Sequence, residues 1–327
     1  MQVTAETDGA FYFARMLLSE PPTIGAYALA GIDDGNYGRI CVLGLDDEAR
    51  ATIDFNGGPR VELDCAIATN SSDAEAMQIS NNSTVSASAL IAHGGISGAD
   101  SPKVTTGQIA TNVPRVTDPL GVNGRDLQVP PRGLCDVNGK TQLKNDTTLS
   151  PGRYCGDLRV NGGTITFLPG VYIIDGGDFK TTGQSTLVGD GVTFVMTGSS
   201  SSAIGNVDFA GGTSLNLRAP DANDAQARAL GYEGVLFFQD PAAPVSPGNG
   251  QPDNKLLGGS VARLEGWIYF PRQTLLYTGG ADLDESCLAI VARKVMFRGN
   301  ASFVQTPGVC DDLGVEEIRT PSVRLMG

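Results

Sequence analysis

The sequence has few of the residues on which most catalytic and metal sites depend. Its 327 residues include one histidine and one tryptophan, and none of its six cysteines lies at the C-x-x-C spacing of zinc sites. Charged residues make up 18% of the chain, and acidic residues outnumber basic ones 36 to 23. The resulting net charge of −13 repels phosphate groups, so nucleic acid is a poor partner.

Long apolar runs are also absent. No segment approaches the ~18 consecutive apolar residues of a membrane-spanning helix, and no basic-then-apolar secretion signal opens the chain. Residues 1–6 are instead predicted to form a strand, so we expect the natural polypeptide to begin further upstream.

Glycine and proline are abundant, and part of the glycine follows a repeat of about twenty residues. The chain has 43 glycines and 18 prolines, which argues against long helices. The clearest copies of the repeat are residues 158–174 and 179–195, in which apolar residues alternate on both sides of a glycine corner. Two pairs of landmarks, Gly162 with Gly183 and Gly170 with Gly191, share a spacing of 21 residues.

This repeat predicts a mainly β fold, a parallel β-helix (solenoid) with rungs of ~20 residues. The apolar segments are too short for helices, and their Val, Ile, Phe and Thr content suits strands. One rung cannot bury its own apolar face, whereas stacked rungs enclose a continuous core. An antiparallel sandwich is the alternative, because its strands also recur at short intervals.

The first part of the chain lacks the repeat. Residues 1–48 are predicted to form a small α/β cap, with strands at 3–7 and 23–30 and a helix at 11–18. A solenoid needs such a cap because its open ends expose strand edges and interior side chains. The apolar side of the helix is alternatively a docking face for another subunit.

The β-helix is expected to occupy residues 49–327. Two segments interrupt it near 98–150 and 218–254, and both are rich in residues typical of surface loops. The second segment contains a predicted short helix at 224–230.

The cysteines form three neighbouring pairs in the sequence, at separations of 24, 20 and 23 residues. We interpret them as disulfides, which indicates an extracytoplasmic compartment. Fifteen connectivities are possible for six cysteines, so sequential pairing is a hypothesis. The suspected pairs are Cys41 with Cys65, Cys135 with Cys155, and Cys287 with Cys310.

Catalytic residues are not assigned, although β-helices host polysaccharide lyases and hydrolases. Asp175, Asp178, Asp190 and Asp208 lie on the candidate rungs and would serve glycoside cleavage if two of them converged on one face. They are also typical turn residues, because Asp beside Gly favours tight turns. The single histidine, His93, has no evident catalytic partner in the sequence.

No cofactor and no metal site is predicted, although structural calcium remains an alternative. Acidic clusters at residues 33–34, 46–47, 282–285 and 311–312 offer oxygen ligands, but no EF-hand loop is present. We therefore expect a solvated acidic surface.

Aromatic residues gather in the last third of the chain. Most of them alternate with apolar residues and should be core, but any that face outward beside the polar loops would suit a glycan or protein ligand. The candidate ligand-binding residues are Tyr232, Trp267, Tyr269 and Tyr277.

Seven short motifs, taken in order, resemble the TadG-like proteins of the Tad, or Flp, bacterial pilus-assembly system. Each consists mostly of Gly, Pro and apolar residues, and their order together with the cysteine positions carries the resemblance. The motifs are residues 40–46, 65–72, 118–120, 149–156, 169–177, 234–240 and 266–271.

The resemblance implies a non-enzymatic, extracytoplasmic structural or adhesive component of a pilus. Its expected partners are pilus or pilus-assembly proteins and a surface glycan. Such proteins are held in the inner membrane by an apolar N-terminal helix, which is absent from this sequence, with the rest periplasmic or at the cell surface. The metal motif of von Willebrand-type domains, found in many relatives, is also absent. The alternatives are a carbohydrate-active enzyme and a calcium-dependent surface adhesin.

Overall fold

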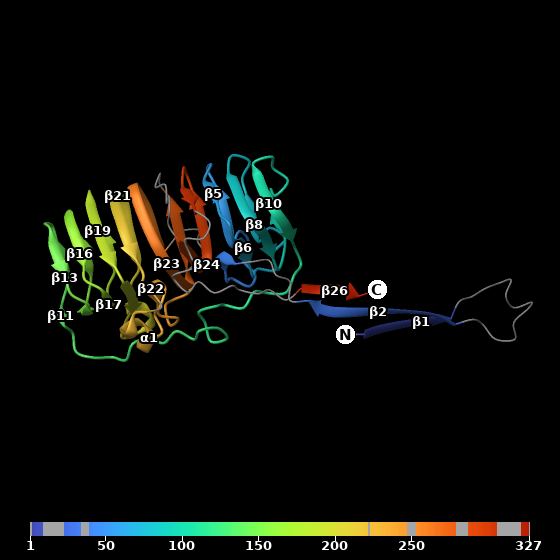
Figure 1. Cartoon of the computed structure of the whole chain (residues 1–327), viewed down its shortest axis with the longest axis horizontal. Coiled ribbons are helices and arrows are strands. Elements are labelled where there is room, and N and C mark those ends of the chain that lie inside the picture. The colour runs from blue at the N-terminus through green and yellow to red at the C-terminus, as the bar shows by residue number, and fades with distance from the viewer. Residues whose placement is uncertain are drawn as a thin grey trace, which may run out of the picture.

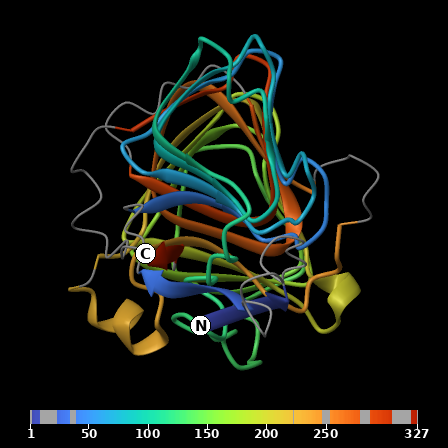
Figure 2. The ribbon, with the colours of Figure 1, turned by 90° about the vertical axis from the view of Figure 1, so that its right-hand side faces the viewer.

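The computed structural model describes residues 2–8, 23–33, 39–221, 223–246, 253–278, 287–305 and 322–326. Most of these residues lie in a parallel β-helix, which confirms the predicted fold (Figure 1). Pairing links 23 of the described strands into one continuous sheet, and its neighbouring strands run parallel, unlike those of an antiparallel sandwich. Viewed along the stack, the rungs superpose in a roughly triangular outline (Figure 2).

The chain builds the β-helix as two coils. The first coil, residues 39–110, begins in the middle of the stack and winds toward the end formed by β9 and β10. Its rungs pair β6 with β3, β7 with β4, and β8 with β5. Its strands are β3 (Ile40–Gly44), β4 (Ile53–Asn56), β5 (Arg60–Glu62), β6 (Ala66–Thr69), β7 (Met77–Ile79), β8 (Thr84–Ala92), β9 (Ile96–Ser97) and β10 (Val104–Ala110).

The second coil, residues 137–305, begins at the opposite end of the stack. Its strands are β11 (Val137–Asn138), β12 (Thr141–Leu143), β13 (Thr147–Leu149), β14 (Gly152–Cys155), β15 (Leu158–Val160), β16 (Gly163–Phe167), β17 (Gly170–Asp175), β18 (Phe179–Thr181), β19 (Ser185–Asp190), β20 (Val192–Thr197), β21 (Val207–Arg218), β22 (Val235–Gln239), β23 (Asn254–Thr278), β24 (Leu288–Arg298) and β25 (Ser302–Val304). From β11 to β20, partners in neighbouring rungs lie between 17 residues (Thr141 and Leu158) and 22 residues apart (Gly170 and Val192). These offsets agree with the predicted period of about twenty.

The two coils meet at a joint in the middle of the stack. The last rung of the second coil, β24 and β25, pairs in parallel with β3, β4 and β5 of the first coil. Across this joint the rings of Phe297 and Phe55 stack with centroids 5.1 Å apart. Arg298 Nη2 lies 2.5 Å from Asp54 Oδ2. The order of rungs in space therefore differs from their order along the chain.

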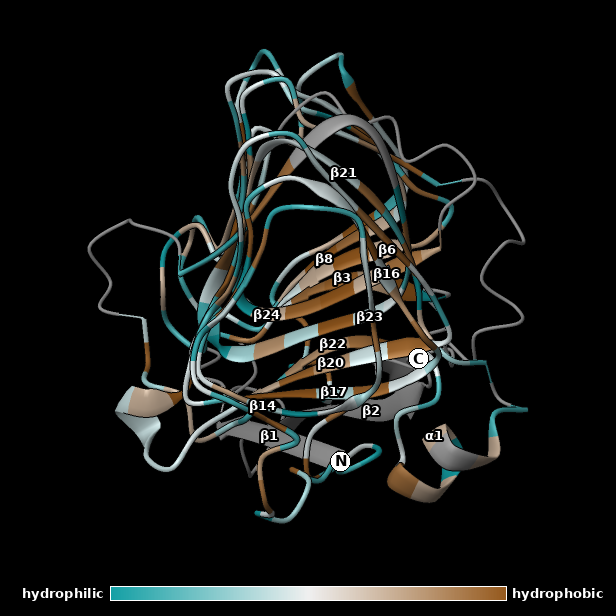
Figure 3. Cartoon of the chain, turned by 90° about the vertical axis from the view of Figure 1, so that its left-hand side faces the viewer, coloured by the Kyte–Doolittle hydropathy of each residue, from teal (hydrophilic) through white to brown (hydrophobic). Residues whose placement is uncertain are grey.

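A return segment, residues 111–136, connects the far end of the first coil to the start of the second. It runs along the outer face of the sheet that contains β3, β6, β17, β20, β22 and the first part of β24 (Figure 1). Apolar residues of β3, β20 and β22 are buried on both faces of this sheet. These strands are largely in the hydrophobic colour in Figure 3. Val116, Leu120 and Leu127 of the return segment cover a second core on the outer face.

The predicted insertion near 98–150 is therefore only partly correct. Residues 111–136 lie outside the stack, but Val104–Ala110 and Val137–Leu149 form its two terminal rungs. Both rungs contain several polar residues, with Asn, Lys and Thr in residues 137–149 and Thr and Gln in residues 104–110, because much of each terminal rung faces solvent. In the other insertion, the predicted helix is confirmed as α1 (Ala225–Leu230), and the Asp224 side chain caps it by accepting from the N–H of Ala227.

The N-terminal part forms a sheet of its own. Strand β1 (Gln2–Asp8) pairs antiparallel with β2 (Thr23–Asp33), and β26 (Ser322–Met326) pairs antiparallel with the other edge of β2. The predicted helix at 11–18 lies outside the described residues. The predicted boundary at residue 48 is corrected, because Ile40–Gly44 is a rung at the joint, buried between β24 and β6.

Candidate functional site

The four candidate aromatic residues do not form a surface. Tyr232, Trp267, Tyr269 and Tyr277 are each at most 3% exposed, so the proposed aromatic ligand face is corrected to core positions. Tyr277 packs in the interior of the β-helix, and the other three belong to the second core under the return segment. Sequence alternation could not reveal this, because the sheet is covered on both faces.

The return segment is fastened over these residues by polar contacts. The hydroxyl of Tyr269 donates to Asp118 Oδ2 at 2.8 Å, and that of Tyr232 donates to the carbonyl of Gln128 at 2.6 Å. Burial is the main cause that raises the pKa of Asp118. His93 Nδ1 lies 2.7 Å from the Val113 carbonyl, which gives the histidine a structural partner.

The carboxylates of the enzyme alternative take part in contacts between rungs. Asp175 pairs with the buried Arg153 at 2.5 Å, and Asp178 accepts from the N–H of Asn206 at 2.8 Å. Asp190 is mostly exposed and lies 3.3 Å from Arg218.

The fourth of these carboxylates, Asp208, is in register with Lys180 on one neighbouring strand and Lys255 on the other. Three of the four carboxylates therefore have a charged or backbone partner, and the fourth is in register with two lysines.

Two of the predicted disulfides are present. Cys41 is bonded to Cys65 beside the joint, and Cys135 to Cys155 at the start of the second coil. Cys287 is also disulfide-bonded, and Cys310 lies outside the described residues. These bonds fit an oxidising, extracytoplasmic compartment. In the described part of the chain, no helix is long and apolar enough to cross a membrane.

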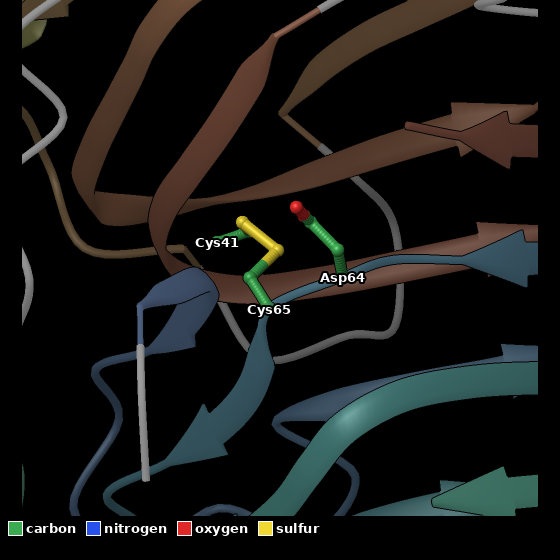
Figure 4. Close-up of side chains that lie close together, drawn as sticks. All are labelled: Cys41, Asp64 and Cys65. Atoms are coloured by element: carbon green, nitrogen blue, oxygen red, sulfur yellow. A yellow bond between two sulfur atoms is a disulfide. The ribbon is translucent and has the colours of Figure 1, made fainter. Parts of the chain in front are cut away.

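One group of potential metal ligands gathers near the first disulfide. Asp64 lies close to Cys41 and Cys65 (Figure 4). The two sulfur atoms are bonded to each other and so are not thiolate ligands. The Asp64 carboxylate is paired with Arg39 at 3.1 Å. Of the three groups, only the carboxylate is therefore able to ligate an ion, and it is already paired.

A pocket beside the joint is the best candidate for contact with a ligand. Its volume is about 370 Å³. Three distant parts of the chain contribute to it: the turn after β3, the loop that precedes β23 together with β23 itself, and β24. Its lining residues are Leu45, Asp46, Asp47, Glu48, Val245, Pro271, Arg272 and Arg293.

The pocket combines a fixed ion pair with an exposed charged rim. Asp46 is held by Arg293 at 2.5 Å and by the backbone N–H groups of residues 48 and 49. The side chains of Asp47, Glu48 and Arg272 are exposed at its edge. This lining offers charges of both signs, so it suits a polar segment or a hydroxyl-rich ligand.

Beside the pocket, Ser246 and Asp253 are joined to β23 by polar contacts. The N–H of Thr274 donates to Asp253 Oδ2 at 3.0 Å, and Ser246 Oγ bonds to the same carboxylate. The N–H of Ser246 donates to the carbonyl of Arg272 at 3.1 Å. Beside the pocket, burial lowers the pKa of Lys294, whose Nζ donates to the Arg50 carbonyl at 3.0 Å.

Sequence reasoning missed this pocket. The only signal was the acidic pair at 46–47, which was interpreted as a solvated surface or a calcium cluster. Asp46 is instead largely buried in an ion pair with a residue 247 positions away. Of the other acidic clusters, the side chains lie outside the described residues.

Comparison of the chain with protein-family models, curated proteins and solved structures finds no match. The resemblance to TadG-like proteins therefore rests on its motifs alone.

Proposed function

We propose that this chain is a non-enzymatic, extracytoplasmic structural or adhesive component of a bacterial Tad/Flp-type pilus. The observation that carries the proposal is the continuous column of rungs, in which two coils are joined in register by β24 and β3. Such a column is suited to bearing load and presenting loops, because each interior rung is bonded to both neighbours.

The positions of the resembling motifs support the proposal. Six of the seven fall on strands of one sheet, the sheet covered on both faces, and the seventh lies in the return segment that covers it. These strands are β3, β6, β14, β17, β22 and β23, and the seventh motif contains Asp118. The resemblance thus follows a single structural unit, a sheet with its cover.

The joint pocket is the proposed contact for the partner. Its exposed charges are placed at the side of the column, where a polar loop of a pilus protein or a glycan can reach them. The disulfides support a location in the periplasm or on the cell surface, where thiols are oxidised.

The test uses cells that lack the gene, with surface fibres counted by electron microscopy and attachment to a surface scored in the same cultures. Loss of fibres indicates a role in assembly, and intact fibres with lost attachment indicate an adhesin. Wild-type values for both measurements contradict the proposal.

Complementation then tests the pocket. A chain carrying Asp47→Asn, Glu48→Gln and Arg272→Gln removes the exposed charges while the buried Asp46–Arg293 pair remains. We expect it to fold normally and to fail to restore the lost phenotype. The matched control, Asp126→Asn with Arg228→Gln, changes exposed charges outside the pocket and outside the terminal rungs, and should restore it.

A further inference from the structure

Both ends of the stack carry strand edges without a partner. At one end, called here the β12 end, β11, β12 and β13 pair only with the next rung inward. At the opposite end, the β10 end, β9 and β10 pair only with β7 and β8. Within the described ranges, no strand lies on the outer side of either edge. Such edges are templates for pairing with another chain.

The core is also incomplete at these two ends. Interior residues in the middle of the stack, such as Phe194 and Phe297, are fully buried. The apolar residues that contact this core while remaining partly exposed are all in terminal rungs: Ile96 and Val104 at the β10 end, and Val137, Leu143 and Leu149 at the β12 end. A further rung at either end would complete their burial and gain hydrophobic stabilisation.

The joint shows that coils of this chain stack on one another. Rung β24 of the second coil covers β3 and β4 of the first, with Val295 opposite Ile53 and Phe297 opposite Phe55. The paired residues are more than 240 positions apart, as in the Asp54–Arg298 pair with a separation of 244. The end of one coil therefore accepts the beginning of another through rung contacts rather than through chain connection.

Strand direction selects the pairing that a second molecule can make. The strands run parallel throughout the stack, so a second copy continues the sheet in parallel only when the β12 end meets the β10 end. Seen from the β10 end, the three-stranded sheet lies at the lower side of the outline of the rungs and leaves the upper sides open (Figure 2).

We propose that the β12 end of one molecule docks on the β10 end of a second copy, which forms head-to-tail chains. Because the two contacting surfaces differ, the contact can repeat without closing. The inference concerns self-association of the folded protein and does not depend on its membership of a pilus.

Backbone donors that would make this contact can be identified at the β12 end. The N–H of Thr141 bonds to Asp157, and the carbonyl of Leu143 accepts from Asn161, so both face the inner rung. Successive residues of a strand present their backbone groups to opposite sides, so the N–H of Gln142 points outward.

The same alternation applies to β13. The Leu149 carbonyl accepts from Leu168 N at 3.0 Å and faces inward, so the N–H of Thr148 points outward. At the β10 end, Val85 N donates to the Lys103 carbonyl at 3.1 Å, which places the N–H of Thr106 on the outer side.

Proline at these positions removes outward donors while leaving the inner ladder intact. We expect the wild-type protein to grow beyond dimers with increasing concentration in sedimentation velocity, and Gln142→Pro with Thr148→Pro to remain monomeric. The matched control, Gln142→Ala with Thr148→Ala, changes the same exposed side chains but keeps the donors and should associate like wild type. Unchanged melting temperature and circular dichroism verify the fold.

A mixing experiment tests the direction of stacking. Thr106→Pro blocks the β10 end, so each blocked variant is monomeric alone, and a mixture of the two yields dimers that do not extend. Leu143→Lys, which places a charge at the open end of the core, blocks the β12 end without a backbone change. It provides the same test if a proline variant unfolds.

Three results would overturn the proposal. The first is a wild-type protein that stays monomeric up to its solubility limit. The second is association that stops at dimers, which indicates contact between like ends. The third is a folded β12-end variant, with either proline or lysine, that associates like wild type.

Discussion

Truncation of Phe297 at the joint should weaken the contact between the two coils, so that they no longer unfold together. The side chain is fully buried and contacts three rings: Phe55 of the first coil at 5.1 Å, and Tyr277 and Phe303 of the second at 5.9 and 5.8 Å. Replacing a buried Phe by Ala costs about 3–5 kcal/mol, to which each aromatic pair contributes about 0.5–1.5 kcal/mol. This is a large fraction of a typical domain stability of about 5–15 kcal/mol.

Comparison of two spectroscopic probes of unfolding shows which part of the molecule has lost stability. In stacked-rung proteins, stability is a sum of unit and interface contributions, so a weak interface lets the units unfold separately. Trp267, the only tryptophan, lies in the second coil, whereas circular dichroism reports both coils. For Phe297→Ala, the denaturant midpoints from fluorescence and circular dichroism should therefore differ, while those of the wild type coincide.

The matched control is Phe194→Ala, within the second coil. Phe194 is equally buried, with neighbouring rings at 4.9 to 5.4 Å, and its truncation should cost a similar amount without affecting the joint. A loss below about 1 kcal/mol for Phe297→Ala would refute the packing argument. Coincident midpoints in that variant would show that the joint is not a boundary between units.

Three further predictions concern the disulfides and the return segment. Replacing Cys135 and Cys155 by Ser should lower the free energy of unfolding, measured with denaturant, by about 2–4 kcal/mol while the Cys41–Cys65 bond stays intact. An unchanged free energy would contradict a stabilising role. Burial raises the pKa of Asp118 above its ordinary 3.8, so its contribution to stability is present below that pH and is lost as pH rises through the folded pKa. The melting temperature of Asp118→Asn minus that of the wild type should therefore rise between about pH 4 and pH 7. A difference that does not change with pH would contradict this assignment. Arg125 donates hydrogen bonds to the carbonyls of Gly231 and Glu233 and to the Glu233 carboxylate. Arg125→Ala should therefore lower the free energy of unfolding by about 1–3 kcal/mol and speed proteolysis within residues 111–136. The control Lys144→Ala, at an exposed site, should change neither.

The local features were predictable because they depend on neighbouring residues. Alternation around Gly162 and Gly183 predicted strands and their period, and Asp224 followed by alanines predicted α1. The cysteine spacings of 24 and 20 also suggested sequential disulfides, and the structure has these two bonds. In contrast, Tyr269 could not be placed from its alternation, because both faces of its strand are covered.

Which residues form short strands and corners was thus settled by local sequence, since alternation and glycine conformation act within a few residues. The order in which the rungs stack was decided only in three dimensions. Apolar burial is non-directional, and β24 offers β3 the same kind of edge that β23 offers β24, the rung that follows it in the chain. The joint, its pocket and the covered sheet arise from contacts between residues more than 100 positions apart, and no short stretch of sequence records which distant rung will be the neighbour.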